Sequence, residues 1–192
     1  RYFESHYNDL SYLLNDNSYN QTNKTKRLNN LTRRIRLELL SYSEIFNIIN
    51  QDKKKYLSYP AVHPIKIDDG KLSSRYGFRR DPIKGNYKFH EGNDFSARIG
   101  TPVIATADGT VKVSKYYNTF GNYIEIDHGY GYSTIYGHLS KRTVKKGEPV
   151  TRGQKIGKVG NTGRSTAPHL HYEVRYNNKN MDPQYYYFDI AQ

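Results

Sequence analysis

The sequence predicts a mainly β protein, in which an antiparallel β-sheet domain follows an N-terminal α-helical hairpin. Two observations lead to this fold class. Up to about residue 57 the chain lacks glycine and its apolar residues recur at three- and four-residue steps, the spacing of amphipathic helices. From about residue 58 short alternating runs are separated by Gly, Asp and Asn, which is typical of strands joined by turns.

The first part contains one long periodic run, which predicts an amphipathic helix from about Thr25 to Gln51. A shorter helix is expected before this run, and a loop over residues 15–20 would join the two helices into a hairpin. Lys53–Lys55, together with Pro60 and Pro64, indicates a linker. The apolar positions of the long run are Leu28, Leu31, Ile35, Leu39, Tyr42, Ile45 or Phe46, and Ile49.

The remaining sequence alternates between apolar and polar residues in several short runs. Such runs occur around residues 111–113, 123–128 and 132–138, and each predicts a strand. In the last of them, residues 132, 134, 136 and 138 are expected to share one face. The dipeptide Asp108-Gly109 predicts a hairpin turn, and residues 177–180 predict another turn.

Composition and charge exclude several classes of site and partner. Among the 192 residues there is no cysteine, which rules out disulfides and thiolate metal ligands. The net charge of +12 is spread along the chain, because ten Lys and Arg stand against six Asp and Glu before Leu57, and twenty against twelve from there on. A nucleic-acid-binding protein would concentrate its basic residues on one face or carry a known module, so we expect no nucleic-acid partner.

The most informative segment is residues 167–174, where two histidines stand two positions apart in a predicted strand. Side chains at positions i and i+2 of a strand share a face. His169 and His171 are therefore expected to point outward together, while Leu170, Tyr172 and Val174 point into a core. Taken alone, this pair is about as consistent with structural histidines as with a metal site.

A second group, from His90 to Asp94, supplies further ligand types. If this segment is one strand, the two residues share a face with Gly92 between them, which leaves room for an ion. Phe89 and Phe95 are then expected to pack behind. Together with a histidine of the other strand, the group offers two nitrogens and one oxygen with one open position, the pattern of a catalytic zinc site.

A third strand contributes His138, which follows Gly137. With His169 it adds imidazoles that a three-ligand site does not need as ligands. Catalysis at zinc requires groups that move protons and stabilise an oxyanion, and two such histidines suit these tasks. His63 and His128 belong to no comparable group and are expected to be structural or surface residues.

Three motifs occur in order along the chain and together resemble the signature of the LytM/lysostaphin-type zinc metalloendopeptidases, which cut peptidoglycan cross-bridges or stem peptides. They are His90-x-Gly-x-Asp94, Tyr-Gly-His-Leu-Ser at 136–140, and Gly-Asn-Thr-Gly-Arg-Ser-Thr-Ala-Pro-His-Leu-His at 160–171. Residues 76–82, 100–103 and 181–183 also resemble this family. The resemblance covers about Ser58 to Tyr187.

This extent divides the chain into a helical region with its linker (1–57), a peptidase domain (58–187) and a C-terminal tail (188–192). Within the domain the chain departs from the family pattern at Ala167, where glycine is usual before Pro-His. An alanine requires an ordinary backbone conformation at this position.

Carried over residue by residue, the resemblance implies zinc ligands at His90, Asp94 and His171 and catalytic histidines at His138 and His169. It implies Zn²⁺-dependent hydrolysis of peptide bonds. One of the two catalytic histidines would accept a proton from water, and the other would donate a hydrogen bond to the oxyanion.

The resemblance also implies a location and partners. The substrate would be peptidoglycan peptides, outside the cytoplasm in the periplasm or cell envelope. The sequence contains no apolar stretch long enough to span a bilayer, but it opens at Arg1 rather than at methionine. This leaves room for an export or membrane-anchor segment upstream, while the helical region could bind a regulatory partner or serve as a spacer.

Two alternatives within the same fold stay open. A non-catalytic relative would bind the wall or activate another wall hydrolase, although such proteins usually lack a ligand and this chain keeps all three. In the other alternative, the helical region, or a loop residue such as Asn15, Asn17 or Asn20, would cover the groove and hold the enzyme inactive.

Overall fold

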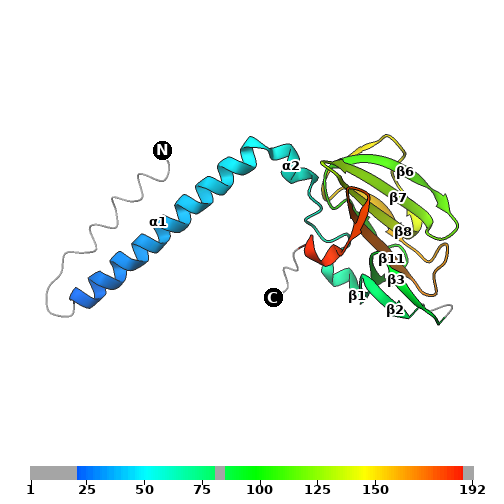
Figure 1. The fold of residues 1–192 in the computed structure, drawn as a ribbon, viewed down its shortest axis with the longest axis horizontal. Helices are drawn as coiled ribbons and strands as arrows, with labels where there is room; N and C mark the ends of the chain where they lie inside the picture. Colours follow the sequence, from blue (N-terminus) through cyan, green and yellow to red (C-terminus); the bar gives the residue numbers. More distant parts are fainter. Residues whose placement is uncertain (1–20, 81–84, 188–192) are drawn as a thin grey trace. The chain divides into compact units, whose positions relative to one another are not determined.

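The computed structural model describes residues 21–80 and 85–187, and the chain divides into two compact units between Gln51 and Asp52 (Figure 1). The predicted fold class is confirmed, since antiparallel strands dominate and a helix precedes them. The first helix of the expected hairpin and its loop, with Asn15, Asn17 and Asn20, lie outside the described residues, as does the C-terminal tail at 188–192.

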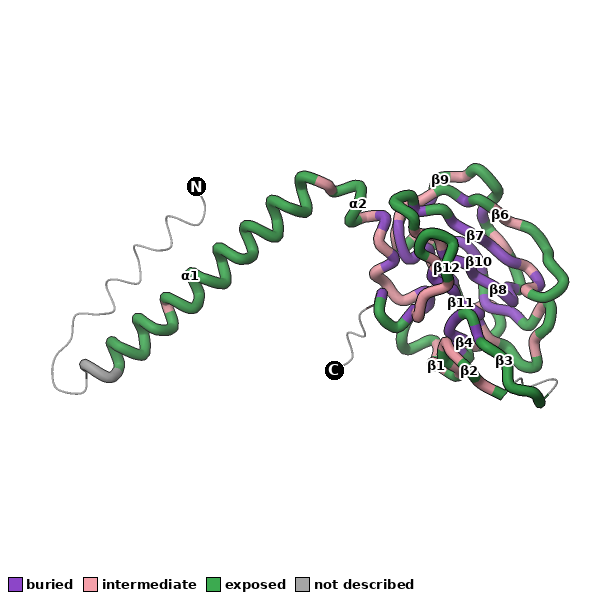
Figure 2. The backbone as a smooth tube through the Cα atoms, viewed as in Figure 1, coloured by how far each residue is buried: buried purple, intermediate pink, exposed green. Residues whose placement is uncertain are grey.

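The first unit contains α1 (Gln21–Gln51), which confirms the predicted long helix. No glycine or proline interrupts it, and its many Leu and Arg residues favour a helix. The large apolar side chains between Leu28 and Ile49 are exposed (green in Figure 2). Within the described part of the chain, no helix is both long and apolar enough to cross a membrane.

The second unit begins with a short helix, α2 (Lys53–Ser58), where only a linker was expected. Asp52 caps its start by accepting a hydrogen bond from the N–H of Lys55, which satisfies one of the free donors of the first turn. At the other end, Nη2 of Arg152 donates to three backbone carbonyls of residues 56–59, at 2.6–3.2 Å. These bonds attach the segment to the β unit.

The strands form two antiparallel sheets. In the ten-stranded sheet the order is β1-β4-β11-β8-β7-β6-β9, with β10 pairing β5 and β8, and β12 pairing β11. β2 and β3 form a separate two-stranded sheet. The strands are β1 (Gly70–Ser74), β2 (Gly77–Arg80), β3 (Tyr87–His90), β4 (Asn93–Ala97), β5 (Pro102–Ile104), β6 (Gly109–Tyr117), β7 (Gly121–Gly129), β8 (Tyr132–Arg142), β9 (Pro149–Val150), β10 (Lys155–Val159), β11 (His169–Tyr176) and β12 (Lys179–Met181).

The turn between β11 and β12 lies within the predicted segment. Asn177 and Asn178 connect the two strands with φ angles of 47° and 62°. A two-residue hairpin requires such positive angles to match the strand twist, and asparagine tolerates them. The residues that follow, Lys179 and Asn180, belong to β12.

The hairpin predicted at Asp108-Gly109 is wrong. β5 pairs with β10, whereas β6 pairs with β7 and β9, so the strands that flank this dipeptide are not neighbours. Oδ1 of Asp108 instead accepts a hydrogen bond from the N–H of Arg152 at 2.7 Å, and the N–H of Asp108 donates to Leu57 at 2.9 Å. Distant segments thus take the hydrogen bonds that a local hairpin would have used.

The apolar core lies in the second unit, on one face of the large sheet. Its fully buried side chains include Phe95, Ile124, Tyr136 and Tyr172, and Figure 2 shows buried stretches along β4, β7, β8 and β11. Burying each such side chain contributes about 1.5–3 kcal/mol. The alternate residues of β11 face the core as predicted, which directs its histidines to the opposite face.

Candidate active site

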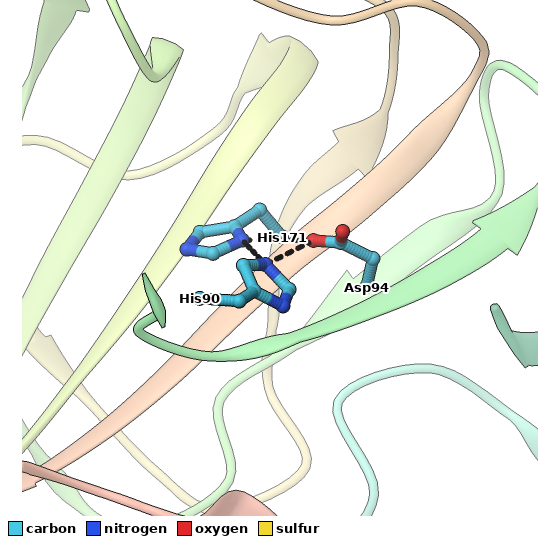
Figure 3. A group of neighbouring side chains, drawn as sticks. All are labelled: His90, Asp94 and His171. Carbon is cyan, nitrogen blue, oxygen red and sulfur yellow. Dashed lines mark hydrogen bonds and ion pairs between the residues drawn. The ribbon is translucent and has the colours of Figure 1, made fainter. Parts of the chain in front are cut away.

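Three candidate ligands come together although each belongs to a different strand. His90 ends β3, Asp94 lies in β4 and His171 lies in β11. Oδ1 of Asp94 is 3.1 Å from Nε2 of His90 and 2.8 Å from Nδ1 of His171, and these two nitrogens are 3.2 Å apart (Figure 3). All three side chains are buried, so the cluster forms a compact, desolvated group.

Strand pairing brings Asp94 to the histidines of β11. In the antiparallel pair of β4 and β11, Asp94 lies directly opposite His171, and Ser96 lies opposite His169. Directly opposite residues share a face of the sheet. His169 and His171 therefore lie on the face that carries Asp94.

His90 arrives by a different route from the one expected. The segment is not one strand, because it changes from β3 in the small sheet to β4 in the large sheet at Glu91 and Gly92. Phe89 consequently packs on Phe78 of the small sheet and is 37% exposed, while Phe95 is fully buried in the core. A change of sheet, rather than strand periodicity, turns His90 toward Asp94.

Gly92 also has another role than the one expected. A Cβ at this position would overlap the backbone oxygen of Tyr172 and lie 3.0 Å from Cγ of Glu173. The glycine therefore lets the connection between β3 and β4 pass close to β11. It does not clear space between the ligands.

Further hydrogen bonds orient the two buried rings. Nδ1–H of His90 donates to the carbonyl of Arg75 at 2.9 Å, so Nε2 is the ring nitrogen that faces Asp94. Nε2 of His171 lies 3.0 Å from Oε1 of Glu173, and this leaves Nδ1 facing Asp94. Such a contact at the second ring nitrogen is typical of histidines that bind metals.

The groups around Asp94 keep its carboxylate ionised. Burial acts to raise the pKa of Asp94, but hydrogen bonds from His171 and His90 outweigh it and hold the pKa well below its usual range. Arg79 adds positive charge, since its Nη2 lies 3.0 Å from Oδ2 of Asp94. Burial also acts against charge on His171, but Asp94 and Glu173 outweigh it and raise the pKa of His171 to about 9.

The donor set fits a small tetrahedral metal ion. Bonds of about 2.0–2.1 Å in a tetrahedron separate the ligand atoms by roughly 3.3 Å, close to the 2.8–3.2 Å between these three atoms. Because Nδ1–H of His90 is donated to Arg75, a neutral His90 ring would face Asp94 with the lone pair of Nε2 across 3.1 Å. Either a proton on Nε2 or a metal ion removes that repulsion.

His138 reaches the same place through an unusual backbone. Gly137 lies opposite His171, and Tyr136 lies opposite Tyr172 in the core. Plain alternation would therefore put His138 on the core side with Tyr136, with which the sequence predicted it to share a face. That expectation is wrong, because His138 has a φ of 59° and the ladder to β7 is irregular at this point. A β-bulge of this kind re-aims the side chain. The ring lies 4.6 Å from that of His169, centroid to centroid.

Both of these histidines donate their Nδ1 proton to the backbone. The acceptors are Thr162 for His138, at 2.8 Å, and Ala167 for His169, at 2.7 Å. In the neutral rings Nε2 therefore keeps a free lone pair, and that of His169 is 3.8 Å from Oδ1 of Asp94. Burial, followed by the neighbouring His169, lowers the pKa of His138 to about 4, so this ring is neutral at pH 7.

The group opens into a cleft with a volume of about 490 Å³. Ala167, which also lines it, is not among the described residues with positive φ, in line with the ordinary conformation expected for alanine. Imidazoles and a carboxylate line the cleft together with apolar residues such as Phe89 and Phe120. All five residues singled out from the sequence line it: His90, Asp94, His138, His169 and His171.

Sequence reasoning missed two side chains that contact the cluster. Glu173 stands two positions after His171, so the alternation that paired the histidines could have identified it. Arg79 contacts Asp94 from β2, in the separate two-stranded sheet. No spacing in the sequence indicated that contact.

Among known protein families, the model of peptidase family M23 matches residues 88–183, which is half of the chain. The chain belongs to peptidase family M23. The resemblance to LytM/lysostaphin-type enzymes is thereby confirmed. All five cleft residues lie within the matched part of this M23 chain.

Curated relatives carry names that refer to peptidoglycan. The M23 chain is 44% identical over 133 residues to the peptidoglycan DD-endopeptidase ShyC of Vibrio cholerae, a match that covers 69% of this chain and 29% of the relative. The peptidoglycan DD-endopeptidase ShyA of the same organism is 50% identical over 105 residues, covering 54% and 24%. The chain therefore spans less than a third of the length of these relatives.

This chain matches one solved structure over nearly the whole length of that structure. The catalytic domain of the antimicrobial peptidase lysostaphin from Staphylococcus simulans is 39% identical with a TM-score of 0.55, covering 60% of this chain and 90% of that domain. The match confirms the fold of the M23 unit.

Proposed function

We propose that this M23 domain, over residues 58–187, is a zinc-dependent endopeptidase that hydrolyses peptide cross-links or stem peptides of bacterial peptidoglycan. His90, Asp94 and His171 hold the ion, and His138 and His169 act on the reacting groups. The observation that carries the proposal is the convergence of three ligand atoms within 2.8–3.2 Å, beside two further imidazoles in one cleft.

The choice of zinc follows from the donors. Two imidazole nitrogens and one carboxylate oxygen with an open position are typical of catalytic zinc sites. A peptidase from Vibrio cholerae with a similar structure, 44% identical with a TM-score of 0.58 over 62% of this chain and 37% of that one, contains zinc. Bound zinc would supply an acidified water and polarise the scissile carbonyl.

The chain's own histidines supply the proton transfers. His138 and His169 lie side by side, and each has Nδ1–H held by a backbone carbonyl. One Nε2 accepts a proton from the attacking water, and the other ring, once protonated, donates a hydrogen bond to the oxyanion.

The substrate and the location belong to the same proposal. The relatives named above are peptidoglycan DD-endopeptidases, and peptidoglycan lies outside the cytoplasm, which supports our proposal of an activity in the periplasm or cell envelope. The proposal also includes a membrane anchor upstream and a regulatory partner for the helical region. A non-catalytic role is disfavoured, because every ligand and both further histidines are present.

Digestion of purified sacculi tests the proposal. The zinc-loaded chain is expected to release soluble muropeptides, and mass analysis of fragments from defined cross-linked muropeptides identifies the bond that is cut. His138→Ala and His169→Ala should keep the metal and each lose on the order of a hundredfold in turnover, whereas Asp94→Ala should weaken metal binding. A zinc-loaded chain that releases nothing, or a fully active His138→Ala, contradicts the proposal.

A further inference from the structure

We propose that Glu173 is a positioning residue of the metal centre. Its carboxylate holds the ring of His171 so that Nδ1, and not Nε2, is the ligand atom. This inference rests on the proposed function for the identity of the ion. It adds a residue for which the sequence and the comparisons give no role.

The burial of Glu173 needs an explanation. Glu173 is fully buried, although it lies on the face of β11 that carries the two histidines. A buried carboxylate is costly unless hydrogen bonds and opposite charges compensate it. Arg175 supplies the opposite charge, since its Nη2 lies 2.8 Å from Oε2 of this carboxylate anion.

The two oxygens of this anion have separate partners. Oε2 accepts hydrogen bonds from Nε and Nη2 of Arg175, at 3.1 and 2.8 Å, and from Nδ2 of Asn180, at 3.1 Å. Oε1 lies 3.0 Å from Nε2 of His171. The donors on Oε2 fix the carboxylate, and Oε1 is thereby aimed at the imidazole.

The anchoring also connects to the other ligand segment. Nδ2 of Asn180 donates to the carbonyl of Glu91 at 3.1 Å, and the backbone carbonyl of Asn180 accepts from the hydroxyl of Tyr76 at 3.0 Å. Glu91 directly follows the ligand His90. Through Asn180, Glu173 is therefore connected to β12 and to the segment that follows His90. These hydrogen bonds hold its carboxylate in place.

A carboxylate at this position has two effects on His171. Accepting Nε2–H fixes the tautomer and directs the lone pair of Nδ1 toward Asp94 and His90, 2.8 and 3.2 Å away. Its negative charge also makes the imidazole a more basic ligand. A role limited to pairing with Arg175 would use Oε2 alone and would leave the contact of Oε1 with His171 unexplained.

Zinc affinity of Glu173→Gln is the test, measured on the full chain by competition with a chromophoric chelator. Losing the charge is expected to weaken zinc binding about 10- to 100-fold. Glu125→Gln is the matched control. Glu125 is a buried carboxylate of β7 that pairs with Lys112 at 2.8 Å and Tyr123 at 3.0 Å, and it contacts none of the three ligands in the described structure.

The outcomes separate this inference from the proposed function. Equal zinc affinities of Glu173→Gln and Glu125→Gln overturn the role of Glu173, even if the wild type cleaves sacculi. If Glu173→Gln binds zinc more weakly as predicted but the wild type cleaves no sacculi, the inference stands and the proposed function is contradicted.

A measurement on the wild type keeps the test valid if Glu173→Gln does not fold. Long-range ¹⁵N–¹H correlation spectra of the zinc-loaded chain report which ring nitrogen of His171 carries the proton. We expect the proton on Nε2, protected from exchange by Glu173. A proton on Nδ1 overturns the inference.

Discussion

His138 combines backbone strain with a position in the cleft. Its φ of 59° lies in the left-handed region, which costs a non-glycine residue about 1–2 kcal/mol. The bonds from its N–H to Phe120, at 2.7 Å, and from its ring to Thr162, at 2.8 Å, hold this conformation. Strain of this kind clusters at functional sites, and here it moves an imidazole from the core side of β8 to the cleft.

His128 lies in a buried polar chain away from the cleft. Its Nδ1–H donates to the carbonyl of Asp108, and its Nε2 lies 2.7 Å from the hydroxyl of Thr134, which bonds in turn to Tyr136. Burial lowers the pKa of His128 to about 4, although the bond to Asp108 opposes this. The folded state therefore requires the neutral ring.

This predicts a loss of stability in acid. Between pH 6.5 and 4 the unfolded chain binds a proton at His128 that the folded chain does not, so the free energy of unfolding falls as pH falls through this window, by up to about 3 kcal/mol. Urea unfolding of the metal-free protein at pH 7, 6, 5 and 4 measures the slope. His128→Gln should be less stable at pH 7 but show a flatter slope, and equal slopes would exclude this role.

The pairing of β4 with β11 and the passage of the β3–β4 connection over β11 together build the ligand cluster. The pairing sets Asp94 opposite His171, and the connection delivers His90 from the small sheet. Contact between that connection and β11 is close at Gly92, where a Cβ would overlap the carbonyl of Tyr172. The position of His90 relative to Asp94 and His171 thus depends on the absence of a side chain at Gly92.

Gly92→Ala is therefore expected to displace the connection. We predict a loss of about 1–3 kcal/mol in the free energy of unfolding, from overpacking, together with weaker zinc binding. Gly147→Ala is the control, since φ is 86° there but a Cβ would meet nothing within 4 Å, so only a backbone penalty of about 1 kcal/mol applies. Thermal unfolding and chelator competition measure both effects. Wild-type stability and affinity of Gly92→Ala would contradict the steric argument.

The second unit contains everything that the proposed chemistry needs. Its core and the five predicted site residues in the cleft lie between Asp52 and Tyr187. The segment from Asp52 to Tyr59 belongs to this unit, because Arg152 donates to its carbonyls and the ring of Tyr59 packs on Tyr132 at 5.5 Å. The compact unit therefore begins before α2.

Two truncations test this boundary. A chain that starts at Asp52 should keep the stability of the second unit within about 0.5 kcal/mol and retain zinc affinity. A chain that starts at Ala61 should lose at least about 2 kcal/mol, because the half-buried guanidinium of Arg152 loses its acceptors. Urea unfolding measures the difference, and equal stabilities would show that the segment does not contribute.

Turnover of the chain that starts at Asp52 also decides between two roles of the helical region. A clear rise over the full chain supports inhibition by residues 1–51. Unchanged turnover rejects that alternative and leaves a spacer or partner-binding role for the exposed apolar side chains of α1.

Local patterns determined a large part of this protein. The long helix, the antiparallel strands and the shared face of His169 and His171 follow from periodicity, since side-chain direction in a strand depends on position alone. Three ordered motifs were enough to indicate the M23 family. The turn at Asn177-Asn178 was also encoded locally, because its residues tolerate positive φ.

Tertiary structure alone decided the rest. It split the segment from His90 to Asp94 between two sheets, gave Gly92 its contact with β11, and turned His138 out of the core through a bulge. It also brought Arg79 to the candidate ligands and replaced the hairpin at Asp108 by long-range bonds. These features depend on which strands become neighbours, and pairing between distant strands is set by the packing of the whole sheet rather than by the order of residues within any one segment.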